Sequence, residues 1–312
     1  MFAYVIKRLV YGVATILILA TLIFFLMHAA PGDPLLGEKA SSPEIRANLV
    51  KHYGLDQPLL VQYGRFMYSV FIKWDFGISY AQKNRFVNDI IREHFPVSAV
   101  LGLLAIVMAA VGGILFGALT ALYRNKLPDR IIMILVIIGV SVPNFVFAAW
   151  GQFFIVKINA FFDATVIPVA GWGTFQHMLA PAFFLELGTL AYLTRLMRSS
   201  MLEVVNTDYI RTAKAKGLSP ARIFFQHQFR NAILPIVTVL GYAFAAITTG
   251  GFVVETLFAV PGLGRYFVLA VQQLDYTVIM GTGVFYGSYL IIMANIIDII
   301  YGFVDPRIRV NR

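Results

Sequence analysis

Long hydrophobic runs, separated by short polar segments, are the main pattern along this chain. A helix rises about 1.5 Å per residue, so roughly 20 apolar residues cross the hydrocarbon core of a bilayer. We predict an all-α membrane protein with six transmembrane helices, at residues 9–29, 97–123, 131–156, 178–197, 236–258 and 278–303. The chain then divides into an N-terminal segment with the first span (1–30), an extracytoplasmic helical segment (31–96) and a core of five spans (97–312).

The first hydrophobic run has two readings. Lys7 and Arg8 precede it and His28-Ala29-Ala30 follows it, which is the order of a secretory signal peptide with a weak cleavage site. Its apolar part is longer than the hydrophobic region of a signal peptide. We therefore predict an uncleaved membrane anchor.

The longest polar segment on the predicted cytoplasmic side, residues 198–235, contains a predicted helix, a glycine elbow and a second helix. Asp208 is a good cap for a helix over 209–216, and Gly217 supplies the left-handed residue that commonly ends a helix. Ser219 then caps the second helix, with Pro220 at its first position. We predict that this segment is a docking element.

The chemistry of the elbow suits contact with a partner protein. Small residues allow close approach, and basic residues orient the partner. The alternative is an amphipathic helix at the inner leaflet, with its basic residues facing lipid phosphate. The candidate docking residues are Tyr209, Arg211, Thr212, Ala213, Lys214, Ala215, Lys216, Gly217, Leu218, Ser219 and Arg222.

The segment 31–96 is predicted to be structured. We expect one helix from Ser42 to Gly54 and a second from Pro58 to Lys73. Tyr68, Phe71, Trp74 and Phe76 are aromatic residues of the kind found at membrane interfaces. The segment is either a cap packed on the spans or a surface that receives a partner.

Composition and charge agree with a membrane protein. The chain is 59% hydrophobic and only 13% charged, and its mean hydropathy is +0.76. Most of the 25 Lys and Arg residues lie on one side of the predicted spans, in the N-terminal segment, after the second span, in 198–235 and after the sixth span. This positive-inside pattern places both termini in the cytoplasm and explains the net charge of +9 without nucleic-acid binding.

Four residues in or near the spans are candidates for the translocation path or its gating: Glu186, Glu255, Asp298 and Pro143. Ionisable groups inside a bilayer are costly and commonly face a cavity or a partner. Structural hydrogen bonding is the alternative for the acids. Glu255 is expected near the solvated outer end of the fifth span, and Asp298 is expected to pair with a neighbouring span. Pro143 should kink the third span.

Catalytic motifs are missing from the sequence. There is no Gly-x-x-x-x-Gly-Lys-Ser/Thr phosphate loop and no Gly-x-Ser-x-Gly elbow, and the five histidines lack metal-binding spacing. We therefore predict no catalytic residue, no metal site and no cofactor bound by this chain. Any ATP and Mg would be held by partner chains.

Six sequence fragments together carry a resemblance to a known family. The chain resembles the dipeptide and oligopeptide ABC importer permeases, specifically their B-type subunits, from end to end. The fragments are Tyr4 to Val10 with Ala30-Pro31-Gly32-Asp33-Pro34, Gly54-Leu55-Asp56-Gln57-Pro58, Trp74-Asp75-Phe76-Gly77, Asp208 to Gly217, Val260-Pro261-Gly262-Leu263-Gly264-Arg265, and Asp305-Pro306-Arg307-Ile308-Arg309.

The resemblance implies a type I ABC importer fold in the cytoplasmic (inner) membrane of a bacterium or archaeon. It also implies a second homologous permease, two ATP-binding subunits, an extracytoplasmic substrate-binding protein and a peptide substrate, with membrane lipid around the chain. The elbow around Gly217 would then contact the ATPase subunits. In the EAA motif of the family, Arg211, Thr212 and Ala213 stand where Glu-Ala-Ala is usual, and Pro235 comes later than the usual proline.

We therefore expect a permease subunit of a binding-protein-dependent peptide importer. One alternative is a proton-coupled secondary transporter that uses Glu186 or Asp298. Others are an ABC importer for a nickel chelate, glutathione or an oligosaccharide, and a membrane scaffold without transport activity.

Overall fold

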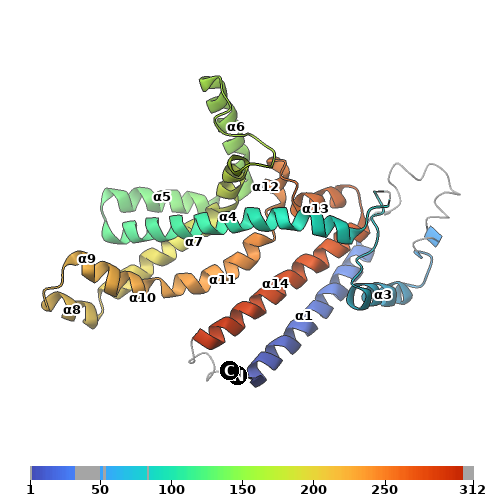
Figure 1. The fold of residues 1–312 in the computed structure, drawn as a ribbon, viewed down its shortest axis with the longest axis horizontal. Helices are drawn as coiled ribbons and strands as arrows, with labels where there is room; N and C mark the ends of the chain where they lie inside the picture. Colours follow the sequence, from blue (N-terminus) through green and yellow to red (C-terminus); the bar gives the residue numbers. More distant parts are fainter. Residues whose placement is uncertain (1, 32–49, 52–53, 83, 305–312) are drawn as a thin grey trace. The chain divides into compact units, whose positions relative to one another are not determined.

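The computed structural model describes residues 2–31, 50–51, 54–82 and 84–304 (Figure 1). The regular elements among them are helices, and a single isolated bridge joins Ile78 and Phe86. The all-α class is therefore confirmed. The chain forms two compact units, one from residues 1–98 and 261–312 and the other from residues 99–260.

In the unit that contains both ends of the chain, α1 (Phe2–Ala29) packs against α14 (Tyr276–Val304). The helices run antiparallel, with Gly12 beside Asn295 and Leu19 beside Gly287. A Cβ atom added at Gly287 would lie 2.0 Å from Leu19 Cδ2. Gly287 therefore allows the two helix backbones to approach closely, as small residues do in membrane helix pairs.

The same unit contains α3 (Leu59–Tyr68), the π-helical turn η1 (Ser69–Lys73) and α13 (Leu263–Gln272). The predicted helix from Pro58 to Lys73 is confirmed, because η1 continues α3 without a break. The predicted helix after Ser42 lies largely outside the described residues. The long helix α4 (Val87–Leu122) begins in this unit and continues into the second at Ala99.

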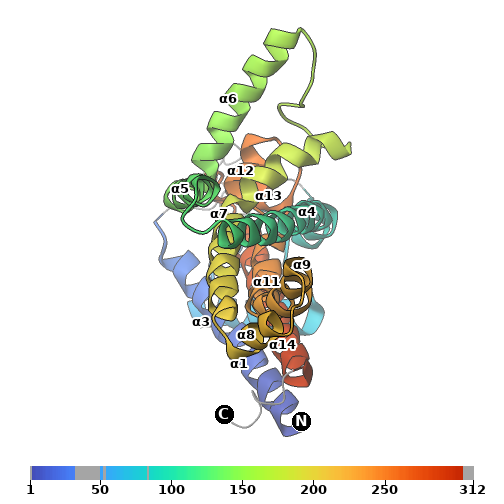
Figure 2. The same ribbon diagram turned by 90° about the vertical axis from the view of Figure 1, so that its left-hand side faces the viewer.

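Helix α7 (Phe175–Val205) is the central element of the second unit. It packs against α5 (Leu127–Ser141), α6 (Asn144–Phe162) and α11 (Leu234–Thr248). The core of this unit joins Leu193, Met197 and Met201 of α7 to Ala232 and Ile236. Figure 2 shows α7 together with its neighbours in this unit.

The predicted third span, 131–156, is wrong as a continuous kinked helix. Helix α5 ends at Ser141 and α6 begins at Asn144, and Val142 between them is extended at φ −102° and ψ 131°. Pro143 has no N–H group and disfavours the helical conformation of the residue before it, so the break is complete. Both figures show α6 leaving the direction of α5.

The predicted fifth span is also interrupted. Helix α11 ends at Thr248, Gly250 has φ +86°, and the short helix α12 (Phe252–Leu257) follows. Before α11 come α8 (Asp208–Ala215), α9 (Pro220–Ile223), the π-helical turn η2 (Phe224–Phe229) and α10 (Arg230–Ala232).

Four helices in the described chain are long and apolar enough to cross a membrane, namely α1, α4, α6 and α14. The pair formed by residues Pro220–Ala232 and Leu234–Thr248, bent by 45°, would add a fifth. Helix α5 has only 15 residues. The chain is a multi-pass membrane protein, and the six-span topology stays a prediction.

Candidate functional site

The elbow between α8 and α9 has the geometry of a Schellman motif. Gly217 has φ +74°, and its N–H donates to the carbonyl of Lys214 at 2.9 Å. The N–H of Leu218 donates to the carbonyl of Ala213 at 3.3 Å. These two bonds satisfy carbonyls at the end of α8 that have no partner within the helix, and they fix the direction in which the chain leaves it.

The second helix of the elbow begins as predicted. Ser219 Oγ accepts a hydrogen bond from the N–H of Arg222 at 3.4 Å, and Pro220 occupies the first helical position. The predicted capping role of Asp208 is wrong. Thr207 is the residue before α8, while Asp208 is its first helical residue and forms an exposed ion pair with Arg211. Asp208 still lies where a negative charge favours the helix dipole.

The elbow has an apolar inner side. Ile210, Ala213 and Ile223 are buried together, and Leu218 packs against them. The expectation that Ala213 approaches a partner is therefore not matched by its position, because Ala213 lies on the same helix face as the buried Ile210. The exposed candidate docking residues are Tyr209, Arg211, Thr212, Lys214, Ala215, Lys216, Gly217, Ser219 and Arg222.

Two lysines carry the free positive charge of this surface. Arg211 pairs with Asp208, and Arg222 Nε donates to Gln226 Oε1 at 3.0 Å. Within the described chain, Lys214 and Lys216 have no ion pair or side-chain hydrogen bond. Their ammonium groups are therefore available to an acidic partner surface.

The elbow is connected directly to the core of its unit. Phe224 and Phe229 of η2 pack against the cluster that contains Met197 and Met201 of α7. Ser200 Oγ donates to the carbonyl of Ala232 at 2.9 Å in a buried position. Packed side chains and this hydrogen bond therefore link the segment that follows α9 to α7. Phe225, by contrast, is exposed.

A buried ion pair between α5 and α7 was not predicted from the sequence. Arg198 donates through Nε and Nη2 to the two carboxylate oxygens of Asp129, each at 2.8 Å. The N–H of Asn125 also donates to Asp129 at 2.8 Å. The Arg198 guanidinium, helped by this N–H, holds the pKa of Asp129 below its ordinary value despite burial. Two residues so far apart in sequence carry no local signal of their pairing.

The acids Glu186 and Glu255 are both buried in the second unit. Glu186 lies on α7, and its Oε2 has no hydrogen-bond partner among the described residues. The prediction that Glu255 is solvated is wrong, because its side chain is 0% exposed. The short helix α12 follows the break at Gly250 and packs against α6 and α7. This packing buries Glu255, which lies on α12.

The other two candidates also have structural partners or roles. Asp298 on α14 forms an ion pair with Arg8 on α1, which confirms the expected pairing between neighbouring spans. The hydroxyl of Tyr4 donates to the Asp298 carbonyl at 3.2 Å. Pro143 lies at the break between α5 and α6. The structure therefore does not show the four candidates as one site.

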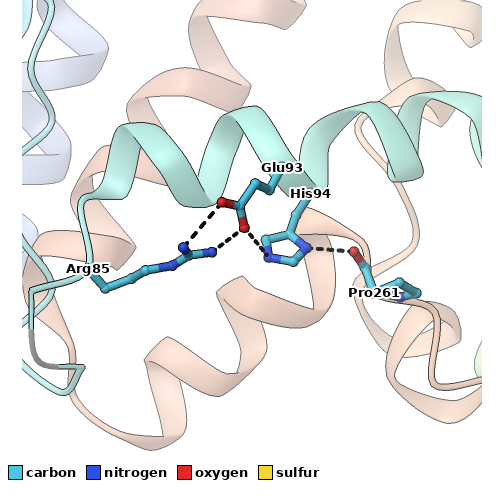
Figure 3. Close-up of polar contacts among 4 residues, drawn as sticks. All are labelled: Arg85, Glu93, His94 and Pro261. Atoms are coloured by element: carbon cyan, nitrogen blue, oxygen red, sulfur yellow. Dashed lines mark hydrogen bonds and ion pairs between the residues drawn. The ribbon is translucent and has the colours of Figure 1, made fainter.

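The segment that begins at Pro261 is held by the start of α4 (Figure 3). His94 Nδ1–H donates to the Pro261 carbonyl at 2.8 Å, and its ring stacks on Tyr266. One helical turn later, Ser98 Oγ accepts the N–H of Leu263 at 2.9 Å. Glu93 pairs with Arg85 and lies 3.9 Å from His94 Nε2. The Pro-Gly-Leu-Gly sequence is thus a clamped structural segment.

Asp275 organises another part of this unit. It is buried at the start of α14, where its Oδ1 accepts the N–H of Val278 at 3.3 Å as an N-cap does. Its carboxylate also accepts hydrogen bonds from Ser79 Oγ and from the N–H groups of Tyr80 and Ala81. An acid directly before an apolar run is a sequence signal that could have predicted this cap.

Comparison with known proteins shows which family the chain belongs to. The profile of a family described as binding-protein-dependent transport system inner membrane component matches residues 113–310, and the profile of its N-terminal region matches residues 1–102. The chain belongs to this family. Members of the family are transport-system permeases, which agrees with the apolar helices seen here.

Similar members of the permease family cover nearly the whole chain. The dipeptide transport system permease protein DppB of Bacillus subtilis is 46% identical over 310 residues, covering 99% of this chain and 98% of the relative. The oligopeptide transport system permease protein OppB of Haemophilus influenzae is 41% identical, and OppB of Escherichia coli K12 is 36% identical. Both matches cover 99% of this chain and 100% of the relative.

Proposed function

We propose that this chain is a permease subunit of an ATP-driven, binding-protein-dependent importer of di- or oligopeptides. The observation that carries the proposal is the similarity, over nearly the full chain, to relatives named as dipeptide and oligopeptide permeases. The chain would form half of a translocation path in the inner membrane of a bacterium or archaeon. A homologous permease would supply the other half.

The elbow around Gly217 is the proposed contact with the ATPase subunits. Its two hydrogen-bonded ends and its buried apolar side give it a fixed shape, and its outer side carries the unpaired Lys214 and Lys216. ATP binding would close the two ATPase subunits and move the elbow. Packing of Phe224 and Phe229 against the core, together with the hydrogen bond from Ser200 to Ala232, would pass this movement to α7.

The test is ATP-driven uptake by the purified complex in proteoliposomes. The complex, with its binding protein, should accumulate a labelled dipeptide or oligopeptide only when ATP is present. Accumulation of a nickel chelate, glutathione or an oligosaccharide instead of peptides would overturn the peptide assignment. Purification of the chain without ATPase subunits from native membranes in mild detergent would overturn the importer assignment.

The elbow contact is tested by reversing its free charge. Lys214→Glu with Lys216→Glu should reduce recovery of the ATPase subunits by at least about tenfold, because two attractive contacts become repulsive. The side chains are exposed and unpaired, so the fold should not change. Lys126→Glu in the loop before α5 is the matched control, since Lys126 is also exposed but lies outside the elbow. Equal recovery from the double variant and the control would contradict the docking role.

A further inference from the structure

A cavity of about 560 Å³ lies in the unit that contains α1 and α14. Its size is within the range of about 300–1,000 Å³ that is typical of ligand sites. The walls are mostly apolar and come from α1, η1, the start of α4 and α14. The apolar lining includes Val13, Leu17, Phe71, Val284, Phe285 and Ile292. We refer to it as the α1–α14 cavity.

Among the described residues, Arg92 is the only charged one that lines this cavity. It is exposed, and within the described chain it has no ion pair or hydrogen bond. Helix α4 therefore presents one unneutralised guanidinium beside a mostly apolar space. An anionic group attached to a long apolar chain would match both features.

Trp74 is a second, independent indication of a ligand. Its backbone is left-handed, at φ 57° and ψ 35°, which is strained for a bulky residue. Asn88 stabilises this conformation by donating to the Trp74 carbonyl at 2.6 Å and by accepting the N–H of Phe76 at 2.8 Å. The indole, which lines the cavity, is still 76% exposed. The two hydrogen bonds of Asn88 thus hold an exposed indole at the cavity.

Asn88 and Arg92 lie one helical turn apart on α4, so their side chains share one face of the helix. Asn88 donates a hydrogen bond to the Trp74 carbonyl, and Arg92 lines the same cavity one turn further along α4. Tryptophan and arginine together suit a lipid headgroup, because the indole prefers the membrane interface and the guanidinium pairs with phosphate. Helices α1 and α14 are both long and apolar enough to lie in the bilayer.

We propose that the α1–α14 cavity binds one phospholipid molecule, with an acyl chain lying along the apolar residues of α1 and α14 that line the cavity and its phosphate paired with Arg92. Trp74 lies over the junction between the headgroup and the chain. Lipid at this position fills the space beside the α1 and α14 pair and supports their packing. The proposal is independent of the transported solute.

Fluorescence quenching by brominated lipid tests the proposal directly. The sequence has three tryptophans, at positions 74, 150 and 172. The variant Trp150→Phe with Trp172→Phe leaves Trp74 as the only reporter. The variant Trp74→Phe with Trp172→Phe leaves Trp150, an exposed residue on α6, as the reference for general lipid contact. Full-length chains are placed in phosphatidylcholine nanodiscs that contain increasing brominated phosphatidylglycerol or brominated diacylglycerol.

We expect brominated phosphatidylglycerol to quench Trp74 at about tenfold lower mole fraction than brominated diacylglycerol with the same chains, because only the former has a phosphate for Arg92. Trp150 should show no such difference. Arg92→Gln should remove the preference at Trp74, Arg92→Lys should retain part of it, and Lys157→Gln should leave it unchanged.

Three results would overturn the proposal. The first is equal quenching curves for Trp74 and Trp150. The second is an unchanged preference in Arg92→Gln. The third is a Trp74 that neither brominated lipid quenches, which would mean that a protein segment covers the cavity.

Discussion

At the scale of single residues, charged side chains gain their importance from burial and from the partner they meet. Asp129 and Asp208 illustrate the difference, because both pair with an arginine close to the predicted cytoplasmic side. The Asp129 side chain is 5% exposed and accepts two bonds from Arg198, whereas Asp208 is 95% exposed and meets Arg211 at 3.4 Å. Exposed pairs contribute little to stability, while removing one partner of a buried pair is costly.

Asp129→Asn should therefore destabilise the detergent-solubilised chain by about 3 kcal/mol, because it leaves the Arg198 guanidinium without its carboxylate. Thermal unfolding followed by intrinsic fluorescence measures the effect. Asp208→Asn is the matched control and should leave the midpoint unchanged. Similar midpoints for the two variants would show that the Asp129–Arg198 pair does not stabilise the fold.

The same pair predicts a pH dependence. The pKa of Asp129 is lowered in the folded chain, first by the hydrogen bond from Arg198. Its contribution is fully present above the pKa of the unfolded chain, about 4, and is lost as the pH falls through the lower folded value. The wild-type chain should lose more stability than Asp129→Asn between neutral pH and acid pH. Parallel stability curves would contradict this assignment.

At the scale of elements, the sequence predicts the ends of the helices in the elbow better than it predicts whether a long apolar stretch is one unbroken helix. The structure confirms the positions predicted in the elbow for Gly217, Ser219 and Pro220. These positions are predictable because the conformational preferences of the three residues act locally. The complete break at Pro143 was predicted only as a kink. A hydrophobicity pattern continues through such a break, so it cannot separate α5 from α6.

A comparison of two glycines isolates the free-energy cost of the left-handed backbone conformation at Gly217. An added Cβ would meet no atom within 4 Å at Gly217 or at Gly64, but only Gly217 has positive φ. Gly217→Ala should cost about 1 kcal/mol because an L-residue is strained there. Gly64→Ala, inside helix α3, should stabilise the chain by about 0.5 kcal/mol or more. Chemical or thermal unfolding of both variants checks the opposite signs, and a shared sign would contradict this account.

At the scale of the whole molecule, composition, charge and fragment order were enough to predict the all-α class and the permease family. These features did not predict which particular side chains, distant in the sequence, contact one another. Arg198 could not be assigned to Asp129, and the burial of Glu255 depends on how α12 packs after the break at Gly250. Such contacts depend on tertiary packing, which a single sequence does not specify.

The energy source of transport separates the importer from a proton-coupled carrier. Of the two candidate proton carriers, Asp298 is paired with Arg8, so Glu186 is the one to test first. Glu186→Gln keeps the size of the buried side chain but cannot lose a proton. In an ATP-driven importer, the variant should retain most of its ATP-dependent peptide uptake, and a protonophore should have no effect on either protein. A proton carrier would instead lose uptake through the substitution or the protonophore, even with ATP present. Uptake in proteoliposomes under these four conditions measures the difference, because only the carrier needs a titrating group to complete its cycle.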